Sequence, residues 1–151
     1  MRLTLHTDYA LRVLIYVGLK QEVLSTIPEL VHHFDIPRGH LMKVVHRLAR
    51  LGYLQTIRGK NGGMRLGREA GKINLAAVVR DMERELGVVG CLQSHPGYCR
   101  IEGCCVLRSA LQEATDAFLT HLSGYTITDL LEPKSALVRL LDMETAGAPT
   151  M

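Results

Sequence analysis

The stretch that decides the fold runs from Thr26 to Leu66 and reads TIPELVHHFDIPRGHLMKVVHRLARLGYLQTIRGKNGGMRL. Its first residues form a capping-box pattern, because Thr26 is a good helix cap and Glu29, three residues on, can reach back to it. Apolar residues at helical spacing then predict a short amphipathic helix as far as Phe34. The following Asp35-Ile36-Pro37 ends this helix, since the residue before a proline avoids the α region.

A second helix is predicted directly after this break, from Arg38 to about Leu51. Its apolar face comprises Leu41, Val44, Val45 and Leu48, and Gly52 is suited to end it. Two helices joined by so short a turn are typical of a helix-turn-helix, whose second helix enters the major groove of DNA.

A β-hairpin is predicted immediately after this second helix. Residues 53–58 read as a strand, Gly59-Lys60-Asn61-Gly62-Gly63 as a tight turn, and residues 64–66 as the returning strand. A hairpin in this position indicates the wing of a winged helix.

Further helices are predicted on both sides of this unit. Apolar spacing indicates helices over residues 7–20, with Thr7 and Asp8 at the N-terminal end, and over residues 74–83, 105–124 and 126–131. The predicted fold class is mostly α with a small β-hairpin wing: a winged helix-turn-helix domain, a cysteine loop and a long dimerisation helix. We expect the DNA-binding domain at residues 1–86, the cysteine loop at 87–105, the dimerisation helix and a packing segment at 106–141, and a flexible tail at 142–151.

The long helix carries a coiled-coil-like apolar stripe. Leu107, Leu111, Ala114 and Phe118 recur at intervals of four, three and four residues. This stripe can pair with a second copy or pack on the chain's own winged-helix domain. We expect a homodimer, because recognition of a palindromic site requires two-fold symmetry.

Positive charge is concentrated in the predicted DNA-binding unit. Nine basic residues and one acid lie between Arg38 and Lys72, a net charge of +8 in a chain whose total is +3. Such a stretch is typical of a protein that binds a polyanion. The candidates for base contact are Arg38, His40 and Lys43, at the leading end of the second helix. The candidates for backbone contact are Arg47 and Arg50 on that helix and Arg58, Lys60 and Arg65 in the wing, whose tip suits a minor groove or its flanking phosphates.

Several classes of protein are disfavoured by what the sequence lacks. It has no apolar run of about 20 residues and no signal-peptide pattern, so we expect a cytoplasmic location and no membrane partner. No Ser/His/Asp set, phosphate loop or C-x-x-C motif is present, so we do not expect an enzyme. A thiol-redox enzyme is the alternative from that class.

Four cysteines, Cys91, Cys99, Cys104 and Cys105, lie in a loop rich in glycine and proline. In the cytoplasm they are more typical of metal binding or redox chemistry than of disulfides. Structural zinc usually takes C-x2–4-C pairs, whereas the gaps here are seven, four and zero residues. An iron–sulfur cluster accepts wider spacing, and the start of the long helix favours thiolates and an anionic cluster. Spacing favours the cluster and leaves zinc and unmetallated thiols open.

Several strings of the chain also resemble one known family. They are Leu3-Thr4 and Thr7-Asp8-Tyr9, the wing string from Arg58 to Gly67, Tyr98-Cys99-Arg100-Ile101, Cys105-Val106-Leu107, and Tyr125-Thr126 with Asp129-Leu130. They resemble the nitric-oxide-sensing repressors within the winged-helix regulators that include the iron–sulfur biogenesis regulator IscR. The resemblance covers about residues 1–140.

This resemblance implies a homodimeric transcriptional repressor with one 4Fe-4S cluster per subunit in the loop at 87–105. Cys91, Cys99 and Cys105 are the implied thiolate ligands, and Asp8 is the implied fourth ligand, reaching across to the partner subunit. Nitric oxide is the implied signal, and nitrosylation of the cluster is implied to release a palindromic double-stranded operator. The chain departs from the family in its long first gap and in an extra Cys104, which is either a bystander or a substitute for Cys105.

Asp8 and the metal each have another interpretation. An acid in the first turn of a helix is stabilised by the helix dipole without any metal, and His6, His95 or solvent can replace Asp8 as a ligand. A zinc- or thiol-based redox regulator with the same DNA-binding domain is the alternative to the cluster sensor.

Overall fold

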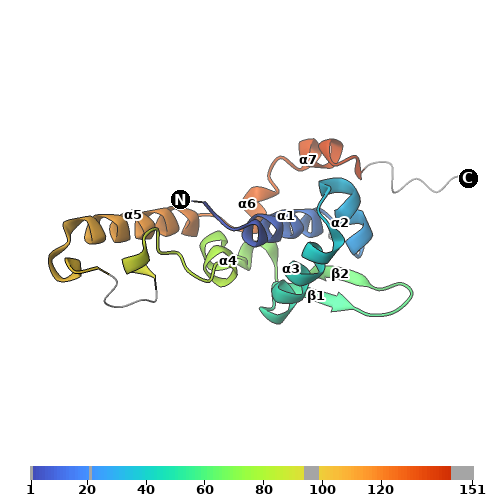
Figure 1. The fold of residues 1–151 in the computed structure, drawn as a ribbon. Coiled ribbons are helices and arrows are strands. Elements are labelled where there is room, and N and C mark those ends of the chain that lie inside the picture. The colour runs from blue at the N-terminus through green and yellow to red at the C-terminus, as the bar shows by residue number, and fades with distance from the viewer. Residues whose placement is uncertain (1, 21, 94–98, 144–151) are drawn as a thin grey trace, which may run out of the picture.

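The computed structural model describes residues 2–20, 22–93 and 99–143. Its elements are α1 (Leu5–Leu19), α2 (Ile27–Phe34), α3 (Arg38–Arg50), β1 (Leu54–Ile57), β2 (Gly63–Leu66), η1 (Ala70–Lys72), α4 (Leu75–Met82), η2 (Gly90–Leu92), η3 (Glu102–Cys104), α5 (Val106–Ser123), α6 (Ile127–Leu130) and α7 (Lys134–Leu140). Figure 1 shows a body that contains α1 to α3 and the hairpin, and an arm, formed by α5, that extends away from it. The predicted fold class is confirmed.

The core of the body is aliphatic and lies where α1 packs against α3 and α4. Leu14, Leu41, Leu48 and Val78 are fully buried there, together with Tyr16. Because the apolar positions of α3 recur at helical spacing, this helix buries one face and leaves the other in solvent, whereas most of α1 is enclosed by its neighbours. As the second helix of the helix-turn-helix, α3 is the recognition helix, and it is therefore held rigidly with its polar face outward.

The wing is a two-stranded antiparallel sheet in which Leu54 lies opposite Leu66. Ser25, just before α2, forms an isolated bridge with Met64 and exchanges two backbone hydrogen bonds of 2.7 and 2.9 Å with it. The wing is thus fastened through β2 to the segment that leads into α2, while its tip extends beyond α3 (Figure 1).

The helix ends follow local side-chain chemistry. The capping box of Thr26 and Glu29 is present at α2, and its Pro28 lies in the first turn. The prediction for the first helix was wrong in detail, because Thr4 caps α1 and Thr7 is buried inside it. Gly52 has a φ of 75°, a left-handed conformation that suits glycine and ends the helical segment after α3.

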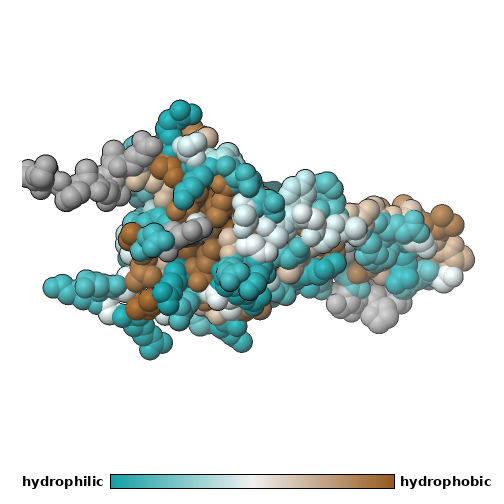
Figure 2. All heavy atoms as spheres, turned by 180° about the vertical axis from the view of Figure 1, so that it is seen from behind, coloured by the Kyte–Doolittle hydropathy of each residue, from teal (hydrophilic) through white to brown (hydrophobic). Residues whose placement is uncertain are grey.

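The arm has little of its own chain to pack against. Of the 18 residues of α5, only Thr115 and Leu119 are buried, where α5 runs along α4. The predicted stripe is largely open, since Leu107 is 64% exposed. Apolar side chains gather at the outer end of the arm, as Figure 2 shows, where Val106 is 81% exposed.

The chain returns to the body after α5. A second capping box, formed by Thr126 and Asp129, begins α6, and Ile127 of α6 is fully buried against the core. The sequence patterns did not predict the short α7 or η1. Within the described residues, no helix is long and apolar enough to cross a membrane.

Candidate nucleic-acid interface and cysteine loop

The outward face of α3 is basic. Leu41, Val44, Val45 and Leu48 face the core, so the residues half a turn away, Gly39, Met42, Lys43, His46 and Arg50, lie on the opposite side of the helix, and all five are exposed. An exposed helix with this surface fits the major groove, which admits one α-helix.

The predicted α3 contacts fall into two groups. Arg38, Lys43 and Arg50 are exposed and have no hydrogen bond or ion pair within the described residues. His40 lies on the flank that faces α1, with its ring centroid 6.1 Å from those of His6 and Tyr9. Arg47 donates a 2.5 Å hydrogen bond to the backbone oxygen of Asp81. These two side chains connect the recognition helix to its neighbours in addition to facing solvent.

Two residues of the outward face were missed by the sequence reasoning. Met42 is 53% exposed, and a β carbon added at Gly39 would have no neighbour within 4 Å. Gly39 is the second residue of α3, and nothing in the described fold requires a glycine here. The signal was available, because both residues lie opposite the apolar face that the sequence defined.

The turn at the tip of the wing has a backbone conformation that requires glycine. Gly59 has a φ of 115°, and a β carbon at Gly62 would collide with the carbonyl oxygen of Ile57. Arg58 and Lys60 at this tip are exposed and engage no other described residue. Arg65 instead donates to the Gln55 side chain across the hairpin, at 2.8 Å.

The end of α4 connects the recognition helix to the wing. Besides binding Arg47 through its backbone, Asp81 accepts a 2.5 Å hydrogen bond from the Tyr53 hydroxyl with its carboxylate. Burial, together with this carboxylate, raises the pKa of Tyr53 to about 12. The Arg68 guanidinium lies 4.7 Å from the centroid of the Tyr53 ring. The phenol therefore stays protonated and holds β1 to α4.

Glu83 fastens the start of α1 to the end of α4. Its Oε1 accepts hydrogen bonds from the Thr4 backbone at 2.7 Å, from the Thr4 hydroxyl at 3.1 Å and from the Thr7 hydroxyl at 2.6 Å. Glu83 lies eight residues before Cys91, so this contact sits at the entrance to the cysteine loop. The first turn of α1, which contains Asp8, is thereby fixed to the segment that leads into that loop.

The four cysteines lie in the segment that precedes α5 and at the N-terminus of that helix. Cys91 lies in η2, Cys104 ends η3, and Cys105 caps α5. Cys91, Cys99 and Cys105 are half-buried and Cys104 is exposed, with no disulfide among them. Within the described residues, no three His, Cys, Asp or Glu side chains are already gathered around a point where a metal ion fits. His95 lies outside the described residues.

The donor set nevertheless fits an iron–sulfur cluster. The Arg108 Nε in the first turn of α5 donates to the Cys91 backbone oxygen at 3.4 Å, and the Glu102 N–H donates to the Cys99 oxygen at 3.2 Å. A hollow of about 270 Å³, lined by both Cys104 and Cys105, opens at the same end of the helix. The cysteine segment thus lies beside a helix N-terminus, where anionic ligands are favoured, although its thiols are not gathered around one point among the described residues.

Asp8 lies apart from this hollow in its own chain. It lies in the first turn of α1, in the body, whereas the N-terminal end of α5, where Cys105 lies, is at the far end of the arm (Figure 1). At a rise of 1.5 Å per residue the 18-residue α5 is about 27 Å long. Asp8 is paired with Arg12, one helical turn on, with an Nη2–Oδ2 distance of 3.0 Å. Asp8 thus belongs to a different part of the fold from the cysteine segment of its own chain.

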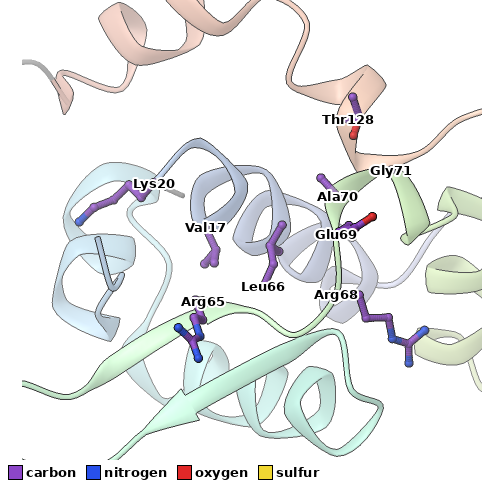
Figure 3. Close-up of a pocket in the computed structure, with 9 residues that line it drawn as sticks. All are labelled: Val17, Lys20, Arg65, Leu66, Arg68, Glu69, Ala70, Gly71 and Thr128. Carbon is purple, nitrogen blue, oxygen red and sulfur yellow. The ribbon is translucent and has the colours of Figure 1, made fainter. Parts of the chain in front are cut away.

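A separate cavity of about 380 Å³ lies between α1, β2, η1 and α6. Its floor is formed by apolar residues such as Val17 and Leu66, and the basic residues at its rim point in different directions (Figure 3). Lys20 is paired with Glu29 at 2.6 Å, and Arg68 donates to the backbone oxygens of Gly52 and Leu51. Because these cations are already engaged and do not converge, the cavity is not arranged to bind an anion.

Comparison with known proteins identifies a family. Residues 3–133 match the model of the Rrf2 family, described as an iron-dependent transcriptional regulator. The HTH-type transcriptional regulator NsrR of Geobacillus kaustophilus is 45% identical over 142 residues, covering 93% of this chain and 97% of that protein. The regulator of the same name in Bacillus subtilis is 41% identical over 145 residues, covering 95% and 99%. These relatives are transcriptional regulators and not enzymes, and the resemblance noted in the sequence is confirmed.

Two solved structures share the fold. CymR of B. subtilis, the global cysteine regulator, aligns with a TM-score of 0.68 at 21% identity, over 86% of this chain and 95% of that one. IscR of T. potens aligns with a TM-score of 0.70 at 17% identity, over 100% and 94%. At these identities the alignments bear on the fold alone.

Proposed function

Because this chain belongs to the Rrf2 family of transcriptional regulators, we propose that it is a repressor that binds a palindromic operator as a homodimer and releases it in response to nitric oxide. The signal is received by a 4Fe-4S cluster, one per subunit, bound by Cys91, Cys99 and Cys105. We expect it to act in the cytoplasm, the compartment that holds the DNA in bacteria such as its relatives.

The observation that carries the DNA-binding half is the free cationic surface shared by α3 and the wing. Arg38, Lys43, Arg50, Arg58 and Lys60 are exposed, and none is neutralised by another described residue. Cations held outward without internal partners bind phosphates and release counterions, which gives a salt-dependent affinity for DNA. The half-buried pairs elsewhere in the body, such as Lys20 with Glu29, do not have this property.

The sensor half is supported by the three half-buried thiols at the base of α5 and by the exposed stripe of that helix. When bound, the cluster supplies iron that reacts with nitric oxide. The thiolates would hold it at the helix N-terminus, at the outer end of the arm, where a second subunit can approach. The open face of α5, with Leu107 exposed, supplies the surface on which that subunit packs.

Asp8 connects the two halves. We propose that it leaves Arg12 to become the fourth ligand of the partner subunit's cluster. Its neighbours His6 and Tyr9 contact His40 of the recognition helix, and Thr7 is held by Glu83. A change in the position of Asp8 therefore moves the contacts that orient α3 in the groove. In linkage terms, DNA and nitric oxide then favour opposite states of this first turn.

The test is spectroscopic and binding-based on the same anaerobic sample. The wild-type protein should show a broad sulfur-to-iron charge-transfer band that nitric oxide bleaches, with parallel loss of operator binding. Asp8→Ala should retain colour but lose the coupling between nitric oxide and DNA. A protein that stays colourless after reconstitution with iron and sulfide would leave a zinc- or thiol-based regulator, and an Asp8→Ala variant with wild-type responses would remove Asp8 from the mechanism.

We expect Met42 to contact a thymine methyl group in the operator, since apolar side chains recognise that methyl in the major groove. Replacing the contacted thymine by deoxyuridine should weaken wild-type binding roughly fourfold, the value of one buried methyl-sized group. The same replacement should leave the affinity of Met42→Ala unchanged. The measurement is a double-mutant cycle on an operator selected by the wild-type protein from a randomised duplex pool. Equal losses for both proteins at every thymine would contradict this interaction.

A further inference from the structure

A basic hollow adjoins the C-terminal half of the recognition helix. It has a volume of about 490 Å³ and is lined by His46, Arg47, Arg50, Leu51 and Arg84. Four of these five residues carry or can carry positive charge, and no carboxylate is among them. Arg84 is the member that does not belong to α3 or to the turn after it, because it follows α4.

The charges around this hollow are available to a ligand. Arg47 is oriented by its hydrogen bond to the Asp81 backbone oxygen, and no carboxylate among the described residues neutralises its charge. Arg50 and Arg84 are exposed and make no hydrogen bond or ion pair within the described part of the chain. The carboxylate of Asp81 is turned to the Tyr53 hydroxyl and that of Glu83 to Thr4 and Thr7. The remaining acid beside Arg84, Glu85, lines the neighbouring hollow and not this one. Several cations around one concave site with no carboxylate in its lining are suited to an anion.

The position of Arg84 is fixed by its neighbour. Glu83 is anchored to the first turn of α1 by three hydrogen bonds, and Arg84 also borders a second hollow, with Thr4 and His6, on the α1 side. Arg84 therefore stands between the start of α1 and the recognition helix. It lies seven residues before Cys91, on the segment that joins the DNA-binding body to the cysteine loop.

We propose that this hollow binds a phosphate of the operator backbone and that Arg84, outside the helix-turn-helix, is one of its ligands. The inference rests on the proposed DNA-binding function and adds a phosphate site to it. The Arg50 side of the hollow belongs to the outward face of α3, so a duplex seated on that face passes over it. A phosphate interaction positions the duplex without reading its sequence.

The test compares Arg84→Ala with Arg80→Ala, a matched control that removes the same charge from an exposed residue of α4 that does not line the hollow. Holoprotein affinities are measured against salt concentration for the selected operator and for a duplex of random sequence. Arg84→Ala should weaken both by the same factor, on the order of tenfold at moderate salt. It should also make the slope of log K against log salt shallower by about one for each phosphate that is no longer neutralised. Arg80→Ala should match the wild type.

Each other outcome opposes the inference. An unchanged salt slope for Arg84→Ala would rule out the phosphate interaction, and a loss of affinity confined to the operator would make Arg84 a base-reading residue instead. Equal losses for Arg80→Ala would indicate a diffuse effect of net charge. If the wild-type protein binds neither duplex, the proposed function itself fails, whereas failure of the hollow alone leaves wild-type binding intact. Since Arg84 is exposed, its replacement should leave the unfolding midpoint unchanged, and this check separates weakened DNA binding from a damaged fold.

Discussion

Replacing Cys91, Cys99 or Cys105 singly by serine should abolish the retention of iron and sulfide. The Cys104→Ser variant should retain both at the wild-type level. A serine hydroxyl stays protonated near neutral pH and is a poor replacement for a thiolate ligand. The adjacent pair at the base of α5 provides the sharpest contrast, because Cys105 is the half-buried helix cap and Cys104 is exposed. The measurement is iron and sulfide content per chain, with the visible absorption band, after anaerobic reconstitution.

The comparison between Cys104 and Cys105 decides the ligand set. If Cys104→Ser loses the cluster and Cys105→Ser keeps it, the third ligand is the exposed cysteine and the proposed set is wrong. If all four variants keep iron without sulfide, the site binds a mononuclear metal. The buried core of the winged-helix body does not include these residues, so its circular dichroism should be unchanged in every variant.

Leu41→Ala should lower the free energy of unfolding by about 2–5 kcal/mol, the usual cost of a buried leucine truncated to alanine. Leu41 is fully buried in the core that α3 shares with α1, so its removal leaves a cavity that the neighbouring helices cannot readily close. The next residue, Met42, is 53% exposed, and Met42→Ala should change stability by less than about 0.5 kcal/mol. Urea unfolding followed by circular dichroism measures both.

These neighbouring substitutions separate folding from recognition. Leu41→Ala should reduce stability with little effect on the sequence preference of the remaining folded protein, and Met42→Ala should do the reverse. A large decrease in the stability of Met42→Ala would mean that this side chain is covered in solution, contrary to the outward face described for α3.

The elements of the body were predictable because their signals are local. The capping box of Thr26 and Glu29, the proline at 37 and the glycine at 52 act within a few residues of themselves, so α2, α3 and the hairpin emerge from pattern alone. The cap of α1 was misplaced because Thr4 and Thr7 are both suitable, and the choice is made by Glu83, which lies far along the chain. Local pattern contains no information about such a partner.

The residues of the candidate site also differ in whether local sequence pattern could place them. The cations of α3 and the wing could be placed on a surface from their spacing, because an amphipathic helix exposes whatever lies opposite its apolar face. Arg84 could not, since its relevance comes from the folded arrangement that brings the end of α4 close to Arg47 of α3 and not from any motif. The fold also does not gather the cysteines into a finished site among the described residues.

The exposure of most of α5 has a thermodynamic consequence. An isolated helix of this length is marginal in water, and two buried residues add little to hold it. The arm is then ordered mainly by what binds to it, so its stability follows mass action and rises with protein concentration. The body, with its own core, should melt at a temperature independent of concentration. Dilution would therefore loosen the sensor while leaving the DNA-reading surface folded, and the cellular abundance of the protein would itself set how much of it can respond.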